Sequence, residues 1–201
     1  MEQEILSKDM IPQPELWRCA MEIGSDRLDV ALFPPVATER LIHRTILLNP
    51  DASSHEKAVQ EAIYANPLLL SDFARIDVVI DTPDFALVPA ETAGSTEPEA
   101  IFKAASFDLT DKIVEVSQPD DSISIVFAVP AAIAGFIRRT FFNVRINHSL
   151  APLIATRLHA SAIFASVTDS KVDIIAADGN NLLLANSFRC ATPEDATYYI
   201  V

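Results

Sequence analysis

The amino-acid sequence predicts an α/β fold in which helices pack on mixed β-sheets. Three observations lead to this class. Residues 16–33 contain two apolar runs on either side of a short polar turn, which is typical of a β-hairpin. The continuous apolar runs at 76–80 and 123–129 are typical of strands that are buried on both faces. Segments with a helical spacing of apolar residues lie between such strands, so the chain opens in the order strand, strand, strand, helix, strand.

Local signals place the remaining elements. Pro12 and Pro14 predict that the first residues form a loose lead-in. The hairpin turn begins at Gly24, a residue that can adopt a positive φ without steric cost. Strands are expected where short apolar runs lie between turn residues, at 38–48, 85–88, 113–116, 142–146, 172–175 and 182–188. Helices are expected where capping residues precede apolar positions at helical spacing, after Ser53, Thr96, Pro130, Ser149 and Thr192.

Changes in composition and in the length of the expected elements indicate how the chain is divided into domains. The expected parts are a lead-in at residues 1–15, a first domain at 16–148 and a second domain at 149–201. Short elements and a polar stretch at 91–97, expected to be a loop, predict that residues 81–118 form a small subdomain inserted in the first domain. The second domain opens with a crossover helix that is expected to reach Ala162. Its last helix is short, which indicates either a longer relative or a short docking helix.

Composition excludes several classes of function. The formal net charge is −13, which disfavours binding to nucleic acids and to anionic lipid surfaces. No apolar run approaches the roughly 20 residues of a membrane-spanning helix, and the start of the chain lacks the pattern of a signal peptide. We therefore expect a cytoplasmic protein without direct membrane insertion. Cys19 and Cys190 lie in apolar runs and are expected to be buried thiols, and the four histidines do not cluster as metal ligands would.

The order of these elements resembles the actin-like ATPase (ribonuclease H-like) fold of actin, sugar kinases and heat-shock chaperones. The texture is most similar to the bacterial actin-like proteins of type IV pilus assembly and cell division, which carry an inserted subdomain at the same point. The segments that carry the resemblance are VVIDTPDFALVP, EPEAIFKAASF, IVFAVPAAIAGFIRR and VRINHSLAPLIATRL. More closely still, the chain resembles an uncharacterised bacterial family of this fold. The resemblance implies an inserted small subdomain and a shortened second domain.

The resemblance also implies where a nucleotide would bind. In active members the first hairpin reads Asp-x-Gly, and its Asp works on the metal and the attacking water. Here Glu22 stands at the Asp position, two residues before Gly24. The phosphates of ATP would sit on two facing turns, which here are Gly24-Ser25-Asp26-Arg27 and Asp178-Gly179-Asn180-Asn181.

Both turns depart from the pattern of the active members. Asp26 and Asp178 would bring negative charge close to a polyphosphate. The chain has four glycines and no Gly-Gly pair, so it lacks the glycine run that lets the backbone approach a phosphate closely. The resemblance therefore implies a degenerate nucleotide site. Its remnants are Glu22, Gly24, Ser25, Asp26, Asp178, Gly179 and Asn180.

Three functional interpretations follow. The first is a non-catalytic protein-binding or scaffold module that uses no cofactor, with residues 81–118 as the surface for a protein partner. The second is an ATP-dependent phosphotransferase or ATPase that uses Mg²⁺ and Glu22. The third is an unrelated hydrolase or metal enzyme, whose scattered acids would be Asp81, Asp84, Glu91, Asp108 and Asp111. His148 is expected to lie beside a helix cap rather than to line a cleft between domains.

Overall fold

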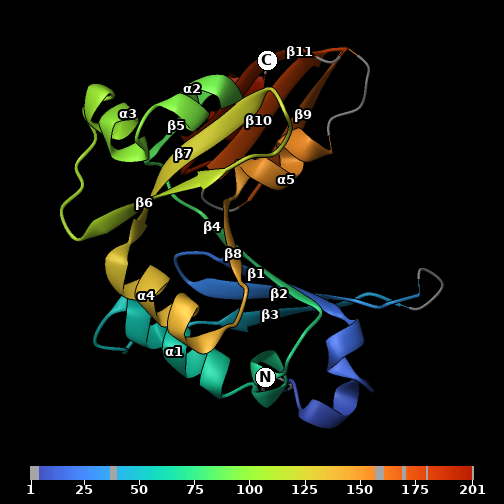
Figure 1. Ribbon diagram of the computed structural model, residues 1–201. Helices are drawn as coiled ribbons and strands as arrows, with labels where there is room; N and C mark the ends of the chain where they lie inside the picture. The colour runs from blue at the N-terminus through green and yellow to red at the C-terminus, as the bar shows by residue number, and fades with distance from the viewer. Residues whose placement is uncertain (1–4, 37–39, 157–160, 169–170, 180, 201) are drawn as a thin grey trace. The chain divides into compact units, whose positions relative to one another are not determined.

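The computed structural model describes residues 5–36, 40–156, 161–168, 171–179, 181–200 and no others (Figure 1). The chain forms two compact units. The first unit contains Met1–Thr82, Leu109–Glu115 and Ala128–Asn147, and the second contains Pro83–Asp108, Val116–Phe127 and His148–Val201. The predicted inserted segment, 81–118, is thus divided between the units, with most of it in the second.

A five-stranded sheet with the strand order β3-β2-β1-β4-β8 organises the first unit. Its strands are β1 (Arg18–Ile23), β2 (Arg27–Phe33), β3 (Ile42–Leu47), β4 (Arg75–Ile80) and β8 (Arg145–His148). β1 pairs antiparallel with β2 and parallel with β4, and both registers run unbroken along all six residues of β1. The predicted opening order of three strands, a helix and a fourth strand is therefore confirmed.

One face of this sheet is apolar because side chains alternate along each strand. Cys19, Met21 and Ile23 of β1 are buried on that face. Helices α1 (His55–Tyr64) and α4 (Ala131–Thr140) cover the same face and lie side by side (Figure 1). The rings of Tyr64 and Phe136 meet edge to face, with their centroids 5.8 Å apart.

The predicted capping box starts one residue too early. The N-cap of α1 is Ser54, whose hydroxyl accepts a hydrogen bond from the Lys57 amide. With Ser54 in this role, Lys57 occupies the position at which a capping box has Glu or Gln. The cap therefore saturates one of the orphan amides of the helix and leaves Glu56 to accept a hydrogen bond from Gln60.

The lead-in is anchored rather than loose. It contains two short 3-10 turns, η1 (Lys8–Met10) and η2 (Pro14–Leu16). Leu6 is fully buried, its amide donates to the Asn66 side chain, and its carbonyl accepts from the Leu68 amide at the turn η3 (Pro67–Leu70). The prolines break regular structure, as the sequence indicates, but buried side chains hold the segment in place.

The second unit contains β5 (Phe85–Pro89), most of β7 (Ile123–Pro130), β9 (Ala162–Val167), β10 (Lys171–Asp178) and β11 (Asn181–Arg189). Two three-stranded sheets have the orders β5-β7-β6 and β11-β10-β9, where β6 is Lys112–Ser117. The helices of the second unit are α2 (Ala90–Ser95), α3 (Pro98–Ala104), α5 (Leu150–Ala155) and α6 (Pro193–Ile200). α6 packs on β10, and Thr192 caps α6 by accepting from the Asp195 amide, as expected.

Two expectations for the second unit are wrong. The stretch 91–97, expected to be a loop, begins with the short helix α2, which packs against β5. The helix after Ser149 ends at Ala155 instead of reaching Ala162, and the Thr156 hydroxyl donates to the carbonyls of Pro152 and Leu153 in its last turn. Ala162 instead begins strand β9. The predicted Leu158 of that helix lies outside the described residues.

Within the described residues, no helix has both the length and the apolar character that crossing a bilayer requires. Cys19 and Cys190 are buried free thiols, as expected. Burial raises the pKa of the Cys19 thiol to about 12, with the Asp77 charge as a smaller contribution.

Replacing Glu115 tests the electrostatics of the first unit. Burial raises the pKa of this β6 carboxyl, and the Arg138 guanidinium, 2.5 Å away, opposes the shift. A raised pKa means that the neutral form is favoured by folding, so this stabilisation is present at low pH and is lost as pH rises through the folded-state pKa. The unfolding free energy of Glu115→Gln, measured by urea denaturation, should therefore rise relative to wild type as pH increases above the ordinary pKa of a glutamate carboxyl, about 4.3. The exposed Glu99→Gln serves as control, and a difference that stays constant with pH would contradict the assignment.

Candidate functional site

The ends of two parallel strands bring the first bend and Asp81 to one edge of the five-stranded sheet. β1 ends at Ile23, directly before Gly24, and β4 ends at Ile80, directly before Asp81. The Asp81 amide donates to the Ile23 carbonyl at 3.4 Å. Ligands of open α/β sheets bind outside the carboxyl ends of the strands, so this edge is the first place to look for a site.

The backbone of the first bend is already used by the hairpin. The Gly24 amide donates to the Arg27 carbonyl at 3.0 Å, and the Asp26 carbonyl accepts from the Leu48 amide at 2.8 Å. Gly24 does not use the positive φ that is open to glycine, and the bend closes without it. A methyl group added at Gly24 would lie 3.4 Å from the Arg27 carbonyl oxygen, which is ordinary contact.

His55 lies against this bend, and the sequence reasoning missed its position. Its Nε2 is 2.9 Å from the Gly24 carbonyl oxygen. The cavity at this bend has a volume of 220 Å³. Ligand sites span roughly 300–1,000 Å³, so this cavity alone would hold only part of a nucleotide. Its lining consists of Ser25, Asp26, Leu48, Asn49, Pro50, Ala52, Ser54, His55 and Ala58.

Glu22 lies on the other face of the sheet from α1 and α4. It is exposed, whereas its neighbours Met21 and Ile23 are buried. In the register of the hairpin it stands opposite Asp29, whose carboxylate pairs with the Arg27 guanidinium at 3.2 Å. The register therefore places Glu22 opposite a second acidic residue, and Glu22 is not in the lining of the cavity.

The second bend joins β10 to β11 in the second unit. Asp178 pairs with Asn181 across the turn, and Gly179 has φ +58°, the left-handed conformation that glycine adopts easily. The Asp178 carboxylate accepts a hydrogen bond from the Ser161 hydroxyl. Asn180, the remaining predicted residue of this bend, lies outside the described residues. The predicted hairpin is thus present, and each bend belongs to its own unit.

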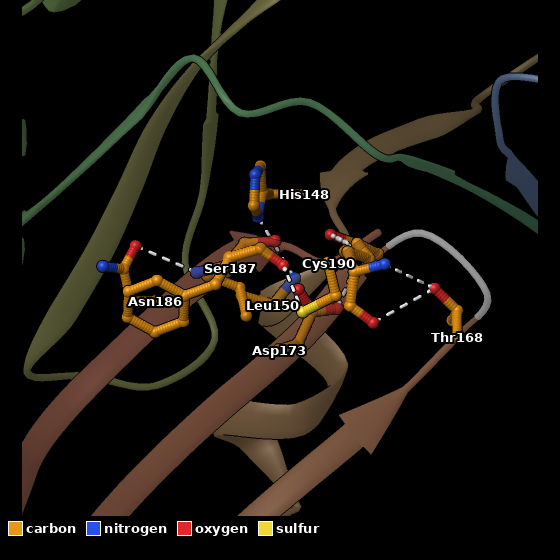
Figure 2. A network of polar contacts seen from close by, with 10 residues as sticks. His148, Leu150, Thr168, Asp173, Asn186, Ser187 and Cys190 are labelled. Carbon is orange, nitrogen blue, oxygen red and sulfur yellow. Dashed lines mark hydrogen bonds and ion pairs between the residues drawn. The ribbon is translucent and has the colours of Figure 1, made fainter. Parts of the chain in front are cut away.

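A buried polar network lies where α5 starts, beside the beginning of β10 and at the other end of that strand from the second bend (Figure 2). His148 is fully buried, and its Nδ1 accepts from the Leu150 amide at 3.1 Å, so the ring caps α5. The His148 amide donates to the Ser117 hydroxyl at 2.8 Å. The ring packs against Phe85 and Phe127, with centroid distances of 4.5 and 5.4 Å. The expectation that His148 belongs to a helix cap is confirmed.

Lys171 and Asp173 form an ion pair in the same network. The Lys171 ammonium is 2.8 Å from Asp173 Oδ2 and 3.4 Å from the Ser149 hydroxyl, and both charged side chains are buried. The other oxygen of Asp173 has no hydrogen-bond partner among the described residues. Both residues of the pair lie on β10, and the contact from Lys171 to Ser149 links the start of this strand to the N-cap of α5.

The scattered acids of the third interpretation do not meet. In the part of the chain that the structure describes, no group of three or more His, Cys, Asp or Glu side chains is placed to hold a metal ion. Asp81 lies at the edge of the first unit's sheet, whereas Asp84, Glu91 and Asp108 belong to the second unit.

The strand order, the inserted elements and the position of the first bend define an actin-like ATPase fold, as the sequence predicted. The chain belongs to the family described as protein of unknown function (DUF3822), whose model matches residues 17–201. Comparison with curated proteins gives no significant match.

Solved structures confirm the fold. A Bacteroides thetaiotaomicron protein with an actin-like ATPase fold and unknown function matches with a TM-score of 0.82 and 19% identity, over 95% of this chain and 77% of that one. The cytoplasmic domain of EpsL, an inner membrane component of the type II secretion system of Vibrio cholerae, matches with a TM-score of 0.53 and 10% identity, over 86% of this chain and 71% of that one. The PilM–PilN type IV pilus biogenesis complex gives a TM-score of 0.49 and 12% identity, over 88% and 62%.

Alanine substitutions distinguish the two bends. Gly24→Ala should leave the free energy of unfolding unchanged or raise it by up to about 1 kcal/mol, since the conformation and space allow a methyl group. Gly179→Ala should lower it by about 1–2 kcal/mol, because alanine is strained at φ +58°. Urea denaturation of both variants checks this. Equal effects at the two positions would show that the bends do not differ as described.

A double-mutant cycle tests the buried ion pair. Lys171→Met should destabilise the protein by about 3–5 kcal/mol, because it leaves the buried Asp173 carboxylate without its partner. The double variant Lys171→Met/Asp173→Leu should recover most of this loss, since neither charge then remains buried. Chemical denaturation of wild type, Lys171→Met, Asp173→Leu and the double variant completes the cycle. Additive losses would show that the two side chains do not act as a pair.

Proposed function

We propose that the protein is a non-catalytic binding module of the cytoplasm, with an actin-like fold, a degenerate nucleotide site and no bound cofactor. One observation carries the proposal: the Gly24 amide, which would have to meet a phosphate, is hydrogen-bonded to Arg27 within the hairpin. Backbone amides at a phosphate site must point at the ligand, so an amide that closes its own turn contributes nothing.

Charge at the bends supports the same conclusion. The exposed side chain of Asp26 lies directly on the first bend, and Asp178 flanks the second. Each carboxylate would repel a polyphosphate unless a metal ion lay between them. Gly179 is left-handed and open, but a single glycine does not provide the bare backbone of a glycine run.

Without nucleotide chemistry, the role that we propose for this chain is binding to another protein. EpsL, one of the structural neighbours, is a component of a secretion system, which supports a role within an assembly. Residues 81–118 are the proposed contact surface. Deleting this segment would not be a clean test, because β5 and β6 flank β7 in one sheet. Point substitutions on the surface are needed instead.

Calorimetry with Mg-ATP tests the proposal. The purified chain should show no saturable heat at millimolar nucleotide, because the bends offer carboxylates and engaged amides. The variant Asp26→Asn/Asp178→Asn separates the effect of the carboxylates from that of the engaged amides. If the engaged amides alone prevent binding, this variant should also show no saturable heat with Mg-ATP. Micromolar binding of Mg-ATP to the wild-type chain would overturn the proposal.

A second candidate is an ATP-dependent phosphotransferase or ATPase that works through Glu22 and Mg²⁺; the cavity beside Ser25 and Asp26 would hold part of the nucleotide, and Glu22 lies outside its lining. This function requires ATP turnover that disappears in Glu22→Gln. Turnover that persists in that variant would exclude Glu22 as the group that acts on the attacking water.

A further inference from the structure

An apolar groove lies between two sheet edges of the second unit. It has a volume of 370 Å³. β5 and β11 form its walls, and each is the outermost strand of its three-stranded sheet in the part of the chain that the structure describes. The lining residues are Leu87, Val88, Pro89, Ser122, Ile123, Leu182, Leu183, Leu184 and Ala185, of which Ser122 alone has a polar side chain.

The two walls differ in regularity. β5 pairs with β7 in an unbroken register from Phe85 to Pro89, so its outer edge is a regular backbone edge, whose first amide donates to Pro83 and whose last residue, Pro89, has no donor. β11 carries a bulge: Leu182 stands opposite Ala177 and Leu184 opposite Ala176, which leaves Leu183 unpaired between them. The bulge turns two successive leucines outward, with 68% of Leu183 and 44% of Leu184 exposed.

Acidic residues lie at one end of this apolar groove. Asp120 and Asp121 directly precede the lining residue Ser122, and Glu91 follows Pro89 by two residues. The Ala90 amide donates to the Ser122 carbonyl, so these two acidic segments lie at the same end of the groove. The stretches 83–108 and 116–127 together contain seven acidic residues and one basic residue.

We infer that this groove binds an extended, apolar segment of another protein that is flanked by Lys or Arg residues. The segment pairs its backbone with the regular edge of β5, and its apolar side chains lie on the outward leucines of β11. Basic flanks complement the acidic end of the groove. A second copy of this chain is disfavoured as the occupant, since it would bring another net charge of −13 and the same acidic end. The inference rests on the proposed protein-binding function and names its surface and the chemistry of its partner.

Synthetic peptides test the groove on the full chain. The probe is a fluorescent ten-residue peptide of alternating valine and threonine between two pairs of lysines, and its match has glutamates in place of the lysines. Fluorescence anisotropy should show binding of the lysine peptide and at least about tenfold weaker binding of the glutamate peptide. Hydrogen exchange should show new protection at the amides of Ala86 to Val88 in β5.

Two variants make the test specific. Leu183→Glu should weaken the lysine peptide about tenfold or more, whereas Leu47→Glu, at a leucine with a similar exposed fraction of 64% in the first unit, should have no effect. Glu91→Lys/Asp121→Lys should reverse the preference in favour of the glutamate peptide.

Equal binding by wild type and Leu183→Glu, or protection elsewhere than β5, would overturn the inference. So would self-association or vesicle binding that Leu183→Glu abolishes, since the occupant would then be a second copy or a lipid surface. Failure of the peptide test leaves the calorimetry with Mg-ATP unaffected, so the groove and the proposed function can fail separately.

Discussion

The backbone of β1 is hydrogen-bonded on both sides along its whole length. This pairing determines both the position of the first bend and the use of its backbone amide. It brings the first bend and Asp81 to one edge, where an actin-like protein would hold phosphates. It also carries the hairpin ladder into the bend, so that the Gly24 amide closes the turn. Breaking one such bond costs only about 1 kcal/mol, roughly a factor of five to ten in affinity. The loss of nucleotide binding that we propose therefore needs the acidic side chains of the bends as well as the engaged amide.

The second unit depends on polar contacts inside its core. The fully buried His148, which precedes the N-cap Ser149, accepts a hydrogen bond from the first amide of α5, and the Lys171 ammonium reaches the Ser149 hydroxyl from β10. Lys171 and Asp173 both lie on β10, and buried charges of this kind are costly to desolvate and add little net stability even when they are paired. The contact between Lys171 and Ser149 therefore ties the start of α5 to β10, while the ion pair compensates the charge of Lys171 within the strand.

The sequence predicted the elements whose signals are local. Both hairpins, the buried strands and the helix caps at Thr192 and near Ser54 follow from residues close together in the chain. The errors arise where distant contacts decide. α2 contains glycine and serine, which disfavour a helix, and it forms where it packs on β5. β9 alternates between half-buried and exposed residues and exists through its pairing with β10, which periodicity alone did not reveal. The nearness of His55 to the bend at Gly24 depends on the fold for the same reason.

The sequence likewise does not predict which strands lie at the edges of the sheets, because the edge position of a strand depends on the topology of the whole sheet. This has a consequence for what such a fold can retain as its sequence changes. A phosphate site needs particular glycines and carboxylates at fixed positions, whereas an edge strand presents backbone groups that do not depend on side-chain identity. The fold itself persists at 19% identity to the Bacteroides thetaiotaomicron protein, with a TM-score of 0.82. A chain that keeps its strand order therefore keeps its edges, and a few substitutions beside one of them, such as successive leucines at a bulge and acids at its end, suffice to define a partner. Binding of a partner at an edge strand therefore tolerates sequence change better than binding of a phosphate at a bend.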